Sequence, residues 1–224
     1  MQPCEKYLVV FAVALFIGGG CSKIQTEVDV PESSTSRGES TQPDARPQPE
    51  GVEKPDKVRV LIQTSKGDIE AELWPDRAPS TVNNFLRYVD DSFFDGTIFH
   101  RVIDDFMIQG GGFTANMREK PTRDPINNEA QPDVPNHAGT LAMARTSDPH
   151  SATAQFFINL NHNEMLDRDK CPDGWGYAVF GKVVDGMQVV EEIGAVQTHA
   201  ASNGMNDVPV EPVVIESIHR VDLE

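Results

Sequence analysis

The sequence predicts a mainly β fold, either a barrel or a sandwich of short strands, capped by two α-helices. Short runs of β-branched and aromatic residues recur along the chain, and turn-forming segments separate them. Two other segments place their apolar residues at helical spacing instead. Many short strands with only two helices are typical of barrels and sandwiches.

The first predicted element is a β-hairpin. Residues 58–62 carry Val, Val and Ile at every second position, and residues 69–73 repeat the pattern with Ile, Ala and Leu. This period of two places the apolar side chains on one face of each strand. The polar, glycine-containing segment 65–68 between the two runs has the composition of a tight turn.

A helix is predicted next, beginning near Pro79, because proline is tolerated in the first turn of a helix. Val82, Phe85, Leu86 and Val89 follow at spacings of three and four residues, which places them on one apolar stripe. This stripe is the side of the helix that we expect to be buried.

Further strands and one more helix complete the predicted fold. Short strands are expected at residues 97–103, 106–109, 140–144, 155–160 and 177–184, with a closing strand at 213–221. A second helix is expected over residues 186–193, with Met187, Val190 and Ile193 facing inward. The segment 110–137 is rich in Gly, Pro and Asn, and we expect it to be a long loop of the kind on which binding residues often lie.

Residues 1–20 have the pattern of a signal peptide. The apolar run 8–17 is too short to span a bilayer comfortably and has the length of a signal-peptide core. Three glycines before Cys21 resemble the lipobox of bacterial lipoproteins, although Gly18 stands where Leu is usual. We therefore expect lipidation at Cys21, with membrane lipid as a partner and a periplasmic or cell-envelope location. A plain secreted protein and an uncleaved anchor are the alternatives.

Residues 21–56 are expected to form a disordered, acidic tether. This segment is rich in Ser, Thr, Pro, Glu and Gln, and it contains no aromatic residue. Such a composition cannot bury enough apolar area to offset the entropy lost on ordering. We expect residues 57–224 to form the folded domain.

The composition argues against several classes of partner and cofactor. The formal net charge of -16 disfavours nucleic acid, because phosphate binding depends on Lys and Arg. The three cysteines and six histidines form no metal-binding pattern, so we expect neither a metal nor another cofactor. The glycines at 110–112 lack the lysine and spacing of a phosphate-binding loop, and we interpret them as a tight strand exit.

Three segments carry the strongest functional pattern. They are FHRVIDDFMIQGG at 99–111, GTLAMAR at 139–145 and SATAQFFI at 151–158. In this order they resemble the core motifs of the cyclophilin family of peptidyl-prolyl isomerases, especially its bacterial branch, and the resemblance extends from about Val58 to Val221. It implies a closed antiparallel β-barrel that isomerises proline-containing polypeptides, and we expect it to act as a monomer.

The reaction makes specific demands on such a site. Rotation about the peptide C–N bond faces a barrier of roughly 18–20 kcal/mol, and X-Pro bonds isomerise unaided in about 10–100 s. In the twisted transition state the proline nitrogen becomes pyramidal and has a free lone pair, so a donor placed there stabilises that state preferentially. The resemblance implies that Arg101 is this donor, and that Gln109 binds the substrate and holds the arginine.

The resemblance also implies which residues contact the substrate. Phe106, Met107 and Phe157 would line the proline pocket, Ala144 and Arg145 would pair with the peptide backbone, Gln155 would lie beside the substrate, and Met165, Leu166 and Tyr177 would wall the pocket. The sequence departs from better-known members at three positions, with Arg145 where many have Asn, Met165 where Trp is found and Tyr177 where His is found.

Strand periodicity adds expectations about side-chain direction. Gln155 and Phe157 would share one face of a strand, with Phe156 on the other. Met107 and Gln109 would likewise share a face, so Phe106 reaches the same pocket only if the chain bends.

Two other functional interpretations remain open at this point. A noncatalytic peptide-binding or chaperone module can use the same barrel, because a fold does not fix a function. A membrane-anchored structural protein with the tether as its working part is the other. The complete set of Arg101, Phe106, Gln109 and Phe157 favours the enzyme.

Overall fold

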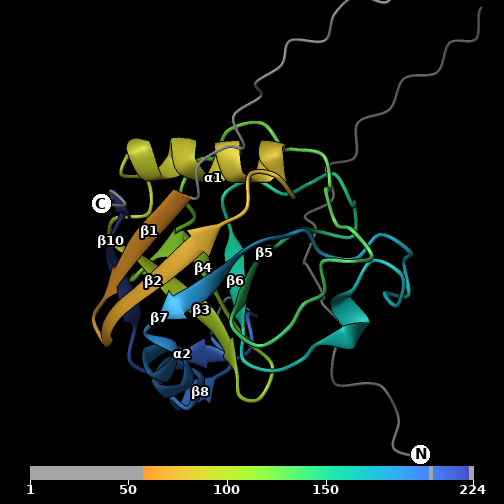
Figure 1. Ribbon diagram of the computed structural model, residues 1–224. Helices are drawn as coiled ribbons and strands as arrows, with labels where there is room; N and C mark the ends of the chain where they lie inside the picture. The colour runs from red at the N-terminus through yellow and green to blue at the C-terminus, as the bar shows by residue number, and fades with distance from the viewer. Residues whose placement is uncertain (1–57, 202–203, 222–224) are drawn as a thin grey trace, which may run out of the picture. The chain divides into compact units, whose positions relative to one another are not determined.

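The computed structural model describes residues 58–201 and 204–221, which form a closed antiparallel β-barrel. Eight strands follow one another in the order β1-β10-β3-β4-β6-β5-β7-β2, and β2 pairs with β1 to close the ring (Figure 1). This confirms the mainly β class and the closed antiparallel barrel that the resemblance implies, and it excludes the sandwich. The predicted signal peptide, the tether and Cys21 lie outside the described residues.

The bounds of the elements agree closely with the sequence pattern in most places. The barrel strands are β1 (Val58–Thr64), β2 (Gly67–Leu73), β3 (Thr97–Ile103), β4 (Met107–Thr114), β5 (Thr140–Met143), β6 (Phe156–Asn159), β7 (Val179–Asp185) and β10 (Val213–Val221). A separate two-stranded sheet pairs β8 (Thr198–His199) with β9 (Val208–Pro209). The helices are α1 (Pro79–Asp90), α2 (Met187–Gly194) and the short 3-10 helix η2 (Glu164–Leu166).

Strand β4 is longer than the sequence pattern predicts. The glycines at 110–112 do not end the strand, which continues to Thr114. The register between β3 and β4 shifts on both sides of Phe99, and Gly111 adopts a left-handed φ of 83° that favours glycine. A Cβ atom on Gly111 would also lie 2.9 Å from the Phe94 ring. The glycines therefore permit close packing, as predicted, but within an irregular strand rather than at its exit.

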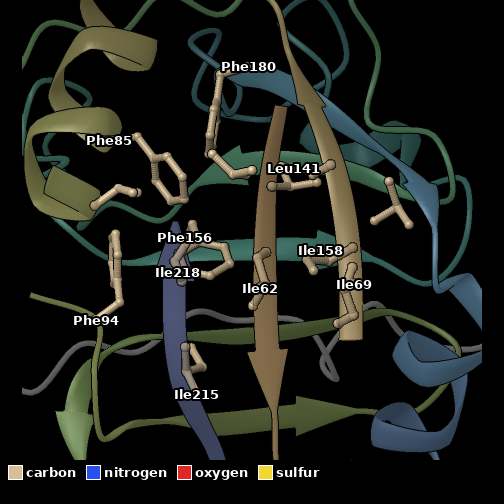
Figure 2. Packing of buried hydrophobic residues seen from close by; sticks show 14 of the residues in the cluster. Ile62, Ile69, Phe85, Phe94, Leu141, Phe156, Ile158, Phe180, Ile215 and Ile218 are labelled. Atoms are coloured by element: carbon tan, nitrogen blue, oxygen red, sulfur yellow. The ribbon is translucent and has the colours of Figure 1, made fainter. Parts of the chain in front are cut away.

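The interior of the barrel holds the main hydrophobic core. Side chains from neighbouring strands meet there, as Figure 2 shows for Ile62, Ile69, Leu141 and Ile158. These four side chains are completely buried. Burial of an aliphatic side chain of this size contributes roughly 1.5–3 kcal/mol, so the alternating strand pattern specifies the inward face of the sheet.

Aromatic rings pack against the side of α1 that faces the barrel (Figure 2). The centroid of the Phe85 ring lies 5.1 Å from that of Phe94, 5.4 Å from that of Phe156 and 5.1 Å from that of Phe180. Tilted and edge-to-face pairs of this kind add about 0.5–1.5 kcal/mol each beyond area burial. All four predicted stripe residues of α1 are buried, which confirms the predicted orientation of this helix.

The two main helices lie at opposite ends of the barrel (Figure 1). Helix α2 begins after Gly186, which adopts a left-handed φ of 82°, and it buries Val190 and Ile193 as predicted. Met187 is only partly buried against the core. In the part of the chain that the structure describes, no helix is long and apolar enough to cross a membrane.

The N-terminus of α1 is capped by a residue from a distant loop. Ala78 at the N-cap position provides no side-chain hydrogen bond. Instead, the Glu129 carboxylate accepts hydrogen bonds from the backbone N–H groups of Ser80, at 3.1 Å, and Thr81, at 2.8 Å, and from the Thr81 hydroxyl, at 2.7 Å. A negative charge is favourable at the positive end of the helix dipole.

We therefore expect Glu129→Gln to lower the free energy of unfolding by about 1 kcal/mol, because a neutral amide replaces one of two acceptor oxygens at the cap. Urea unfolding measures this change. Glu192→Gln on the exposed side of α2 is the matched control. Equal unfolding midpoints for the two variants would contradict the capping role of Glu129.

Candidate active site

Three neighbouring strands bring the central predicted site residues into one row. Arg101 is paired with Gln109 across β3 and β4, and Gln109 is paired with Phe157 across β4 and β6. The row continues to Ala142 on β5. Directly paired residues of antiparallel strands project from the same face of the sheet. Residues that are far apart in the sequence therefore lie side by side on one face.

The adjacent row of residues faces the barrel interior. It pairs Val102, Ile108, Ile158 and Leu141 across the same four strands, and all four belong to the main core. Phe156 is also part of the main core, whereas Phe157 belongs to a different cluster. The predicted alternation is confirmed, and the Arg101 row faces away from the interior.

A second hydrophobic cluster lies on the same face as the Arg101 row. Its buried members are Phe106, Met107, Val134, Ala142, Ala144, Phe157, Leu166 and Val179, with Trp74, Ile103 and Tyr177 partly buried against them. Six predicted substrate-binding residues are therefore brought together. Phe157 and Tyr177 form an edge-to-face pair, with ring centroids 5.7 Å apart.

A turn before β4 brings Phe106 into the second cluster. Asp105 adopts a left-handed φ of 58°, and the Phe106 N–H donates to the Ile103 carbonyl. The Phe106 carbonyl accepts hydrogen bonds from the Leu160 N–H, at 2.9 Å, and from the Asn163 side-chain amide, at 2.8 Å. This is the bend that strand periodicity required for Phe106 and Met107 to reach the same pocket.

Arg101 carries its charge at the edge of this apolar surface. Its side chain is 21% exposed, and its Nε atom lies 3.8 Å from a carboxylate oxygen of Asp207. Burial lowers the pKa of Arg101 and the Asp207 carboxylate raises it, but a guanidinium remains protonated throughout the working pH range. The Asp207 carbonyl also accepts the Val102 N–H at 2.8 Å, which fixes this loop beside β3.

Gln109 and Gln155 form a hydrogen-bonded pair in the row. The Gln109 side-chain N–H donates to the Gln155 side-chain oxygen at 3.0 Å. Within the described residues, the hydrogen bond of the Gln109 side-chain amide goes to Gln155 and not to Arg101. Whether Gln109 also holds the arginine stays a prediction.

Gly112 leaves the space that Gln155 occupies, since a Cβ atom at residue 112 would lie 2.6 Å from Gln155 Cγ. We expect Gly112→Ala to displace Gln155 and to lower kcat/KM for a proline peptide about tenfold, by loss of roughly one hydrogen bond to the site. A protease-coupled isomerisation assay measures the change. In a Gln155→Ala background Gly112→Ala should lower kcat/KM little further. An undiminished decrease would show that Gly112→Ala does not act by displacing Gln155.

The remaining predicted site residues are placed less uniformly. The Ala144 N–H donates to the Gln155 carbonyl at 3.0 Å, so a peptide cannot use this donor without breaking that bond. The Arg145 side chain is only 3% exposed, and its guanidinium is bonded within the protein. Met165 is 39% exposed and lies outside the second cluster, whereas Leu166 beside it is buried there. The substrate contacts of these residues stay predictions.

Several residues of the site were not anticipated from the sequence. Ala142 and Val179 could have been found, because each lies two positions from a predicted site residue on an alternating strand. Trp74 and Val134 come from loops, and Asp207 reaches Arg101 from beyond α2, so no local pattern indicates them. Across the described residues, no three His, Cys, Asp or Glu side chains are grouped so as to hold a metal ion.

Known proteins are similar in sequence to this chain over nearly the whole barrel. Residues 59–220 match the family model described as cyclophilin type peptidyl-prolyl cis-trans isomerase/CLD. A Streptomyces antibioticus protein named peptidyl-prolyl cis-trans isomerase cyp18 is 58% identical over 159 residues, covering 70% of this chain and 95% of the relative. Peptidyl-prolyl cis-trans isomerase B of Escherichia coli is 53% identical over 161 residues, covering 71% of this chain and 97% of the relative.

A solved structure agrees with the barrel architecture. The crystal structure of a cyclophilin type peptidyl-prolyl cis-trans isomerase from Cryptosporidium parvum has a TM-score of 0.61 and 24% identity, and the match covers 75% of this chain and 99% of that one. At this identity the likeness supports the fold alone. The family follows from the sequence matches over the whole barrel: this chain belongs to the cyclophilin-type peptidyl-prolyl cis-trans isomerases.

Proposed function

We propose that the isomerase works by donating a hydrogen bond from Arg101 to the proline nitrogen of the twisted peptide bond. The observation that carries this mechanism is the strand pairing that aligns Arg101, Gln109 and Phe157 in one row, with Gln109 between the other two. A proline ring packed on Phe157 and the second hydrophobic cluster would place its nitrogen toward the charged end of the row. The guanidinium would then meet the lone pair that develops only in the transition state.

The surroundings of Arg101 suit this role. A partly buried charge interacts more strongly with a developing lone pair than a fully hydrated charge does. Asp207 lies too far from the Nε atom for a short hydrogen bond, so the pair leaves donors of the guanidinium for substrate. The mechanism requires no nucleophile, metal or general base, because no covalent bond is made or broken.

The isomerisation rate of Arg101→Ala tests the mechanism. Loss of turnover with the fold intact supports a catalytic guanidinium. Turnover equal to that of an active unaltered protein contradicts it, whereas little turnover in either protein would favour a noncatalytic peptide-binding module.

We further propose that this isomerase acts on proteins outside the cytoplasm, held to a membrane by lipid on Cys21. The apolar run at 8–17 and the small residues before Cys21 support this location. The 21–56 segment would give the catalytic domain reach toward unfolded chains near the membrane.

Intact mass of the membrane-extracted protein tests the anchor. A chain that begins at Cys21 and carries the added mass of acyl groups supports it. A Cys21→Ser variant should then leave the membrane fraction. A mature chain without lipid mass would instead favour the secreted alternative, and a chain that retains residues 1–20 would favour the uncleaved anchor.

A further inference from the structure

Arg145 is the most enclosed cation whose contacts the structure describes, and its donors are used inside the protein. The Nε atom donates to the Gly176 carbonyl at 3.1 Å, and one terminal nitrogen donates to the Thr146 carbonyl at 2.9 Å. The other terminal nitrogen forms an ion pair with Asp173. A side chain that is 3% exposed and bonded to three groups of the protein has a structural role. We call Arg145 and its ion-pair partner Asp173 the clamp.

Asp173 connects Arg145 to the backbone of residues 175–176, which directly precede Tyr177 of the pocket. One oxygen of its carboxylate accepts the backbone N–H of Trp175, at 2.8 Å, and that of Gly176, at 3.3 Å, while the other oxygen binds Arg145. Partial burial raises the pKa of Asp173, but hydrogen bonds from Cys171, Trp175 and Arg145 outweigh it and hold that pKa well below its usual range. The carboxylate therefore stays charged in mildly acidic solution.

The backbone at Gly176 is held from both sides. Its carbonyl accepts from Arg145 and from the Asn128 side-chain amide, the latter at 2.9 Å. Its φ of 64° is left-handed, and a Cβ atom there would lie 2.6 Å from the Arg168 backbone. Tyr177 follows directly, and its N–H donates to the Leu166 carbonyl at 2.9 Å. The backbone position of Tyr177 is therefore set by this loop.

Arg145 also touches the ring of Tyr177 itself. Its guanidinium carbon lies 4.4 Å from the ring centroid, a distance typical of a cation–π contact. Phe157 contacts the same ring edge-to-face. The Tyr177 ring is thus held between the clamp and the wall of the second hydrophobic cluster.

We propose that Arg145 is a positioning residue for the proline pocket, which with Asp173 holds the Tyr177 ring against Phe157 and so sets how tightly a proline ring is gripped. The inference rests on the proposed function, in that Phe157 and Tyr177 are taken to wall the pocket. Arg145 does not touch the rotating bond. Its loss should weaken binding of the proline peptide while the rate on the bound peptide is kept.

Arg145→Met tests the proposal, because methionine fills much of the same buried space without the charge or the donors. The probe is a short peptide with one Ala-Pro bond, and NMR titration and exchange give its dissociation constant and its isomerisation rate at saturation. We expect the dissociation constant to rise about tenfold and the saturated rate to change less than about twofold. Arg220→Met is the matched control, because Arg220 pairs with Asp90 on the exposed surface.

A double-mutant cycle with Tyr177→Ala distinguishes positioning from general stabilisation. If Arg145 acts through Tyr177, Arg145→Met should weaken the peptide no further once the ring is gone, whereas independent effects would add. Additive weakening would overturn the proposal. So would a folded Arg145→Met variant with an unchanged dissociation constant, or one that loses rate and keeps its affinity.

Two further measurements make the result decisive. If Arg145→Met does not fold, Asp173→Asn is measured instead, because it weakens the same ion pair at its more exposed partner. We expect the same rise in the dissociation constant, and an unchanged dissociation constant would contradict the proposal. Arg101→Ala is measured in parallel. An unchanged saturated rate in that variant would overturn the arginine mechanism, while the peptide affinities would still decide the role of Arg145.

Discussion

Replacing Arg101 with alanine is expected to lower kcat/KM for a proline peptide by about 10²–10³-fold. A single preorganised donor aimed at charge that develops in a transition state contributes on this scale in enzymes, about 2.7–4 kcal/mol. Here the donor is partly buried beside an apolar cluster, which strengthens its interaction with the substrate. A protease-coupled or NMR exchange assay measures the loss.

Two comparison variants sharpen this prediction. Arg101→Lys keeps the positive charge but loses the planar fork of donors, so we expect activity to remain at least tenfold below that of the unaltered protein. Arg220→Ala removes a more exposed arginine, at 46% against 21% for Arg101, from an ion pair on β10 and should leave activity unchanged. Equal activity for Arg101→Ala and Arg220→Ala would show that catalysis does not depend on this guanidinium.

Stability is expected to fall by about 3 kcal/mol as the pH drops from 6.5 to 4, because of His100. This residue lies directly before Arg101, is 2% exposed and packs its ring 4.6 Å from that of Phe113. Burial, together with the charge of Arg101, lowers the pKa of His100 from 6.5 to about 4. The difference between the two pKa values corresponds to about 3 kcal/mol.

The direction of the effect follows from proton binding. Between pH 6.5 and 4 the unfolded chain binds a proton at His100 that the folded chain excludes, so acid favours unfolding. The contribution is fully present above pH 6.5 and is lost as the pH falls toward 4. The lowered pKa also keeps His100 neutral near pH 7. No second positive charge therefore lies beside Arg101 at that pH.

Urea unfolding between pH 7 and 4.5 measures this dependence. We expect the fall in the free energy of unfolding to be smaller in His100→Gln by most of the roughly 3 kcal/mol that we assign to His100. The same fall should persist in His219→Gln, which alters an exposed histidine on β10. An NMR titration of the His100 ring gives its pKa directly and does not depend on whether the variant is stable. A ring that titrates near 6.5 would contradict the prediction.

Much of the fold could be predicted because the apolar periodicity is strong. The bounds of β3 and β10 agree with the sequence pattern, and the stripe that includes Phe85 is buried as the spacing predicted. The extent of β4 was not predictable in this way. Glycine usually weakens a strand. In this strand, however, the rings of Phe99 and Phe94 pack so closely against Gly110 and Gly111 that a Cβ atom at either position would clash, and these contacts are visible only in the tertiary structure.

The candidate site divides in a similar way. Arg101, Gln109 and Phe157 were assigned from their motifs, and strand pairing sets them in one row. The motif predicts that Arg145 meets the substrate through its backbone groups, and that stays a prediction, whereas the contacts of its side chain with Asp173 and Tyr177 were not predicted. A motif identifies which residues are present, whereas the direction of a long side chain depends on partners from other loops.

The sequence by itself determined the β class and the inward face of each main strand, because both depend on local spacing, and its three motifs carried the resemblance that implied the site residues. The resemblance already implied that the barrel closes. Only the tertiary structure decided that Asp207 stands beside Arg101 and that Glu129 caps α1. These contacts join segments distant in sequence. Their energies arise when the whole chain packs, so no local pattern encodes them.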